Sequence, residues 1–117
     1  IGPNLPGQTH QGKLYPPETE SLVDVPFVIA SCMVVRRTAL ERIEGCDTDF
    51  QHWAFDLDLC YRLREGGWRV VWAQHVWVNH LQAQAAPEGE LAEISKRDHA
   101  LLEERWPGKL LREDRGR

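Results

Sequence analysis

The sequence has few cysteines and no long hydrophobic run, and each shortage excludes a class of protein. Its three cysteines are odd in number and form no Cys-x-x-Cys pair: Cys32, Cys46 and Cys60. A disulfide framework and a cysteine zinc site are therefore not predicted, and we expect reduced, buried thiols. The longest apolar stretch, residues 25–35, is too short to span a hydrocarbon core of about 30 Å, so no transmembrane segment or signal peptide is predicted.

An excess of positive charge is also missing. Fourteen Lys and Arg stand against eighteen Asp and Glu, for a net charge of −4, so no basic field favours nucleic acid as a partner. The 117 residues, 42% hydrophobic and 27% charged, suit one small packed domain and exclude two enzymatic ones. The chain starts at Ile1 and is rich in proline up to residue 17, which is typical of a segment of a longer protein.

The chain divides by composition into three parts. Residues 1–25 are rich in proline and predict a loop or linker, residues 26–111 form the domain, and residues 112–117 form a charged tail. The apolar run 27–35 predicts a buried strand at the centre of a sheet. Residues 68–72 and 75–80 predict two short extended segments, which could pair with each other or run along one edge.

Three helices are expected around these strands. The first is capped by Thr38 and ends at Gly45, and the second begins near Asp56 and ends at Gly66-Gly67. The third follows Pro87 and ends at Pro107-Gly108. Few strands with about three helices predict an α/β fold.

The densest polar group is the stretch 47–58, with four carboxylates among aromatic residues. A carboxylate at the start of a helix stays ionised and can act as a general base, so Asp56 is a candidate for that role. An N-cap is the alternative role for Asp56, and the spacing alone favours it. Asp58 lies about 200° around the helix from Asp56, so the two carboxylates cannot address the same atom.

Histidine and tryptophan give weaker signals. His75 and His80 lie on opposite faces of an extended segment, so they are not expected to hold one metal ion together. His80 follows the last residue of that segment, and ligands often gather at the ends of strands. Four tryptophans lie near the acidic stretch, where they favour an ordinary core over a carbohydrate site: Trp53, Trp68, Trp72 and Trp77.

Three stretches, in order, resemble the C-terminal half of the catalytic domain of family 2 glycosyltransferases, which are inverting enzymes of the GT-A type. FVIASCMVVRRTALERIEGCD resembles a strand, an Arg-Arg turn and a helix that lead to a "GGFDE" box. FQHWAFDLDLCYRLREGGWRVVW resembles an "EDxDLCxRxxxxGxxV" segment. WVNH and RDHALLEERWPGKL resemble the C-terminal histidine and the helix that follows it.

The resemblance implies roles for particular residues. Asp56 matches the aspartate that deprotonates the acceptor hydroxyl, Trp53 matches an aromatic residue on the acceptor side, and Asp58 is placed there as well. His80 matches the histidine that completes the coordination of a metal bound to the donor. Phe55 stands where the family has Glu, and Cys46 stands where it usually has Phe. The first departure puts an apolar side chain in place of a carboxylate that would help to fix the base or the acceptor.

The function implied is that of a partial GT-A domain, a fragment of an inverting glycosyltransferase. It would transfer a sugar from a nucleotide-diphosphate donor to a hydroxyl acceptor, either a glycan or a lipid-linked one. The divalent metal, Mg or Mn, is expected only with the N-terminal half that carries the Asp-x-Asp motif. We expect a cytoplasmic protein, free or peripheral at the inner face of the membrane.

Two alternatives remain open. One is a non-catalytic carbohydrate-binding or interaction module that keeps the fold, and the other is a purely structural fragment. We expect the isolated chain to be inactive. It should also dimerise, cover its apolar surface with its own proline-rich start, or aggregate.

Overall fold

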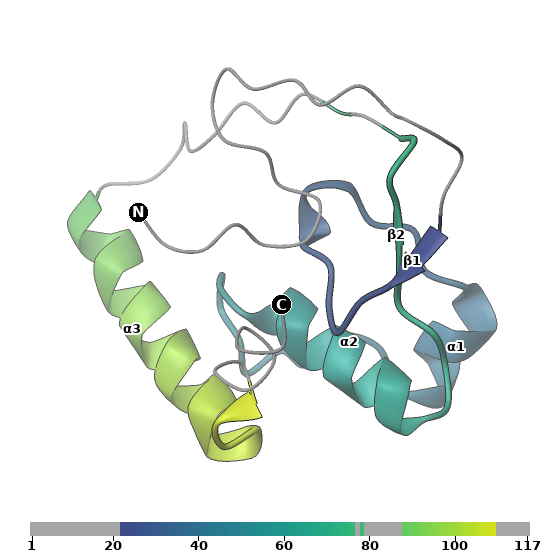
Figure 1. Cartoon of the computed structure of the whole chain (residues 1–117). Helices are drawn as coiled ribbons and strands as arrows, with labels where there is room; N and C mark the ends of the chain where they lie inside the picture. Colours follow the sequence, from purple (N-terminus) through teal and green to yellow (C-terminus); the bar gives the residue numbers. More distant parts are fainter. Residues whose placement is uncertain (1–21, 77, 79–87, 110–117) are drawn as a thin grey trace.

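A computed structural model describes residues 22–76, 78 and 88–109 (Figure 1). In chain order its elements are strand β1 (Leu22–Asp24), the short 3-10 helix η1 (Ala30–Cys32), helices α1 (Arg37–Arg42) and α2 (Phe55–Glu65), strand β2 (Val71–Ala73) and helix α3 (Glu88–Arg105). Helix α2 lies between α1 and α3, and the two strands lie side by side (Figure 1). These elements suit part of an α/β domain, as expected.

The sheet of the described residues consists of β1 and β2 in antiparallel pairing, with Val23 opposite Trp72. The amide of Val25 donates to the carbonyl of Val70 at 3.0 Å, which continues the pairing by one residue. Strand β1 thus lies at the end of the stretch expected to be a linker. Strand β2 overlaps the end of the first of the two expected extended segments, and among the described residues it pairs with β1.

The predicted central strand over residues 27–35 is wrong. This stretch is irregular and contains η1. Phe27 is fully buried, whereas Val34 is 97% exposed. A central strand needs a hydrogen-bonded neighbour on each side, and β1 and β2 pair with each other instead. The apolar side chains at the start of the run pack on α2, so they were identified correctly as core but assigned to the wrong element.

Helix α1 is capped differently from the prediction. Its N-cap is Arg36, and Thr38 lies inside the helix. The helix ends as expected at a turn that contains Gly45, whose φ is 79°. Glu44, just before it, also has a left-handed φ of 64°, which L-residues with a side chain rarely adopt.

Helix α2 is the centre of the fold, because a hydrophobic cluster covers each of two faces. One cluster joins it to the C-terminal part of α3 through Phe27, Tyr61 and Leu102. The rings of Phe27 and Tyr61 meet edge to face with centroids 6.2 Å apart. The second cluster joins Leu59 and Leu63 to Ala39 of α1. This two-sided burial fixes the first turn of α2, where the candidate base lies.

Helix α3 follows Pro87 and ends before Pro107-Gly108, as the sequence predicts. Beyond the helix end, the backbone of Gly108 has a left-handed φ of 64°, which glycine adopts without strain. None of the helices in the described part of the chain is long and apolar enough to cross a membrane.

Candidate functional site

The start of α2 is set by a sharp turn at Ala54. This residue is the N-cap, with φ 61° and ψ −1°, and it is only 6% exposed. A left-handed alanine costs about 1–2 kcal/mol, so the surrounding structure must hold it in place. The turn separates Trp53, which is 45% exposed, from Asp56 in the first turn of the helix. Asp56 is therefore not the N-cap that its spacing favoured.

The carboxylate of Asp56 bridges α2 and the segment before α1. Its Oδ2 accepts a hydrogen bond from the amide of Ala30 at 2.9 Å, and its Oδ1 accepts one from the amide of Leu57 at 3.0 Å. The side chain is half-buried. A carboxylate has about four lone-pair sites, so these two bonds leave one on each oxygen for a further donor.

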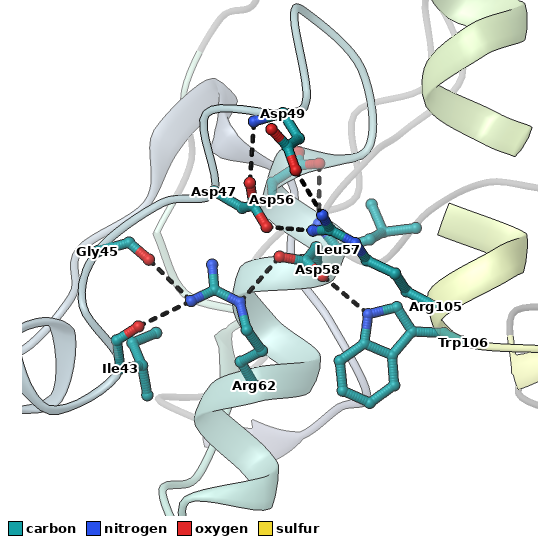
Figure 2. A network of polar contacts seen from close by, with 10 residues as sticks. All are labelled: Ile43, Gly45, Asp47, Asp49, Asp56, Leu57, Asp58, Arg62, Arg105 and Trp106. Atoms are coloured by element: carbon teal, nitrogen blue, oxygen red, sulfur yellow. Dashed lines mark hydrogen bonds and ion pairs between the residues drawn. The ribbon is translucent and has the colours of Figure 1, made fainter. Parts of the chain in front are cut away.

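Asp58 points elsewhere, as the helical spacing predicts. Its side chain is 1% exposed. Oδ2 accepts from Arg62 Nε at 2.8 Å, and Oδ1 accepts from the indole Nε1 of Trp106 at 2.8 Å (Figure 2). The acceptor-side role expected for Asp58 stays a prediction, and a ligand would have to displace one of these buried bonds.

Two arginines hold the loop between α1 and α2. Arg62 Nη1 donates to the carbonyls of Ile43 and Gly45, each at 2.9 Å, so it ties the end of α1 to α2. Arg105 of α3 is paired with Asp47 and, at 2.8 Å, with Asp49 (Figure 2). The pKa of Asp47 is lowered overall. The hydrogen bond from the amide of Asp49 lowers it most, burial raises it, and the pairing with Arg105 lowers it again. These two carboxylates are therefore committed to holding the loop.

The most deeply buried carboxylate among the described residues was missed by the sequence reasoning. Asp98 of α3 is 0% exposed. It accepts hydrogen bonds from three consecutive amides, those of Gln51 at 3.2 Å, His52 at 2.9 Å and Trp53 at 2.7 Å. A signal was present, because Asp98 lies four residues after Ile94 and four before Leu102, on the apolar face of the predicted helix.

The ring of Trp53 lies on the surface between two imidazoles. Its centroid is 5.7 Å from that of His52, at an interplanar angle of 84°, and 6.3 Å from that of His99, at 38°. His99 Nδ1 is 2.7 Å from the carbonyl oxygen of Ser95. Because a carbonyl only accepts, this contact places the proton on Nδ1 and leaves a lone pair on Nε2 in the neutral ring. Trp53 is thus exposed, in contrast to the core role that the tryptophan count favoured.

The remaining candidates are the departures from the family pattern, the cysteines and His80. Phe55 packs against the core cluster on α2, and Cys46 is exposed. Cys32 is exposed too, so only Cys60 fits the expected buried thiol. Burial raises the pKa of Cys60 to about 11. The metal-ligand prediction for His80 lies outside the described residues.

A donor-bound metal is implied by the resemblance, and the described residues alone do not fit one. Within residues 22–76, 78 and 88–109, no three His, Cys, Asp or Glu side chains gather as a metal site requires. Asp47, Asp49 and Asp58 are instead paired with arginines. A metal would need most of its ligands from elsewhere.

Comparison with known proteins agrees with this arrangement of motifs. Residues 18–99 match the family model described as "Glycosyltransferase like family 2". The chain is 31% identical over 87 residues to the N-acetylglucosaminyl-diphospho-decaprenol L-rhamnosyltransferase of two Mycobacterium tuberculosis strains, CDC 1551 / Oshkosh and ATCC 25618 / H37Rv. The aligned part is 72% of this chain but only 28% of those relatives. No solved structure matches significantly. Since the family model covers more than half of the sequence, the chain belongs to the glycosyltransferase-like family 2.

Proposed function

We propose that this chain carries the acceptor side of an inverting glycosyltransferase, with Asp56 as the general base. The observation that carries the proposal is the placement of the Asp56 carboxylate. It is fixed in the first turn of α2 by one amide donor on each oxygen, and it keeps a lone pair on each for a hydroxyl.

In the proposed reaction, the acceptor hydroxyl transfers its proton to an Asp56 oxygen as the hydroxyl oxygen attacks the anomeric carbon of the donor sugar. The bond from that carbon to the diphosphate oxygen breaks at the same time, and the diphosphate leaves with the electron pair. Attack opposite the leaving group inverts the configuration. A positioned base contributes about 10² to 10⁴ in rate to such a step.

The acceptor is proposed to be a glycan or a lipid-linked sugar. The relatives' name describes transfer of L-rhamnose to an N-acetylglucosaminyl-diphospho-decaprenol, which supports a lipid-linked acceptor without fixing it for this chain. The ring of Trp53, which is 45% exposed and lies three residues before Asp56, suits a sugar ring, because aromatic faces pack well on the C–H faces of sugars.

We retain His80 as one proposed ligand of a divalent metal, with the other ligands and the nucleotide-diphosphate donor held outside the described residues. When bound, such a metal would neutralise charge on the leaving diphosphate. The residues described here act on the acceptor.

The test is Asp56→Asn in the protein at its full natural length, with turnover measured against a panel of nucleotide sugars. We expect kcat to fall by about 10² to 10⁴, because the amide cannot take the proton. One of the two hydrogen bonds from main-chain amides to Asp56 is also lost, since an Asn side chain has a single acceptor oxygen. This loss should lower the stability by about 1 kcal/mol. The thermal midpoint is measured alongside so that the two effects are separated.

Glu65→Gln is the matched control, because Glu65 is an exposed carboxylate at the other end of the same helix. Asp58→Asn is unsuitable, since Asp58 is buried and bonded on both oxygens. Turnover near wild type in a folded Asp56→Asn protein would refute the assignment of the base.

One observation favours a second candidate, a carbohydrate-binding module without activity. Phe55, in place of the family's Glu, packs on the core and offers no polar group beside Asp56. The module would bind glycan in calorimetry and show neither transfer nor donor hydrolysis, and Asp56→Asn would leave its glycan affinity unchanged.

A further inference from the structure

The burial of Asp98 is unusual for a helix that otherwise presents apolar side chains inward. Moving a carboxylate out of water costs several kcal/mol unless it is well bonded. Here the structure provides three main-chain donors from consecutive residues, at 2.7 to 3.2 Å. Burial raises the pKa of Asp98, but the three hydrogen bonds from main-chain amides together lower it by more, so the net shift is downward. The carboxylate is therefore ionised at neutral pH.

The three donors belong to the segment that presents Trp53. An apolar residue in place of Asp98 could occupy this buried position without any cost of desolvation, but it could not fix three adjacent amides. Two of the amides, those of His52 and Trp53, share Oδ2, so the carboxylate fixes both the position and the orientation of this turn. The chain then enters the left-handed Ala54 and the first turn of α2.

The next residue of α3 contacts the side chain of the same tryptophan. The rings of His99 and Trp53 lie 6.3 Å apart, and His99 is itself anchored on Ser95, one turn earlier in the helix. Two consecutive residues of α3 thus fix Trp53. Asp98 binds the main-chain amide of Trp53, and the ring of His99 contacts the indole ring of Trp53.

We propose that Asp98 is a positioning residue of the acceptor site, which holds residues 51–53 so that the Trp53 ring meets the acceptor sugar. The inference rests on the proposed function, because it takes Trp53 to contact the acceptor. It makes α3, 45 residues away in sequence, a part of that site. The ligand class is the sugar ring of the acceptor and not the nucleotide donor.

The test compares Asp98→Asn and Asp98→Glu with Glu93→Gln, an exposed carboxylate on the same helix. Asparagine has one acceptor oxygen, so its NH2 group must face at least one of the three amides. Glutamate keeps the charge but moves it by one methylene. Acceptor and donor kinetics are measured in the protein at full natural length, and hydrogen exchange of the amides of residues 51–53 is measured in the same variants.

We expect Asp98→Asn to raise the KM for the acceptor about tenfold, which corresponds to about 1.4 kcal/mol, and to leave the KM for the donor and the kcat within about twofold of wild type. Exchange at residues 51–53 should accelerate. Asp98→Glu should lie between Asp98→Asn and wild type, and Glu93→Gln should match wild type. If Asp98→Asn does not fold, Asp98→Glu decides by the same comparison.

Equal losses for acceptor and donor, or a fall in kcat alone, would overturn the proposal and leave Asp98 a purely structural residue. So would unchanged acceptor KM together with faster exchange. If Asp56→Asn is fully active, the proposed base fails, yet the acceptor KM of Asp98→Asn still tests the positioning role. The two failures are therefore distinguishable.

Discussion

The indole of Trp106 and the carboxylate of Asp58 form a hydrogen bond of 2.8 Å across 48 residues of sequence. Asp58 is 1% exposed, and its other oxygen accepts from Arg62. Each oxygen of this buried carboxylate therefore has a donor, one from its own helix and one from the residue after α3. The bond fixes the end of α3 on α2.

Trp106→Phe should destabilise the fold, because it leaves Asp58 Oδ1 buried without its indole donor. A bond to a charged group is worth about 1.5–3 kcal/mol, and we expect a loss of that size in urea unfolding. Trp68→Phe is the control, since Trp68 is also half-buried and packs on the α1 side of α2; no bond to its indole nitrogen is seen among the described residues. Equal losses in the two variants would mean that the hydrogen bond contributes little beyond ring size.

Acid should destabilise the protein through Asp98 and Asp47. Both have a folded-state pKa below the ordinary 3.8, so the unfolded chain binds more protons as the pH falls. Their contribution is complete above about pH 5 and is lost as the pH falls through the folded-state values. Urea unfolding between pH 6 and pH 3 should show a falling free energy of unfolding, with a shallower fall in Asp98→Asn. An equally steep fall in that variant would exclude Asp98 as a source.

The three thiols should differ in reactivity. Cys32 and Cys46 are exposed, whereas Cys60 is buried, with its pKa raised to about 11. Because the thiolate is the nucleophile, a thiol reagent at pH 8 should modify two cysteines per chain quickly. The third should react only when urea is added. Rapid modification of all three in the native protein would show that Cys60 on α2 is accessible to the reagent, contrary to its burial.

Gly45→Ala should cost about 1 kcal/mol through the backbone alone. The φ of Gly45 is +79°, and an added Cβ would meet no atom within 4 Å, so no clash contributes. Gly89→Ala is the matched control, because that glycine lies in α3 and its site is equally open. There alanine should stabilise by about 0.5 kcal/mol. Opposite signs in thermal unfolding confirm the prediction, and a destabilised Gly89→Ala would contradict it.

The helices could be predicted from the sequence because local signals define them. The start of α2 near Asp56 and the end of α3 before Pro107 followed from spacing and from residues that stop helices. The strand over residues 27–35 could not be judged in this way. Its apolar composition reports burial, but a strand also depends on which partners the rest of the chain supplies, and those partners are distant in sequence.

The candidate site was partly foreseen. The different directions of Asp56 and Asp58 follow from the helical period alone. The three hydrogen bonds between Asp98 and main-chain amides depend on how α3 docks against the turn at 51–53. No local sequence pattern contains that docking. What the sequence did offer was a carboxylate on an apolar helix face, a conflict that points to a buried partner.

The polar contacts between residues 47–58 and the segment 98–106 have a kinetic consequence. They join residues 45 to 58 positions apart, so they all close the same long loop. The entropy of closing that loop is lost with the first of these contacts, and each later one adds energy at little further entropic cost. Docking of α3 should therefore occur in one cooperative step after α1 and α2 have met, and α3 should detach as a unit when the fold opens.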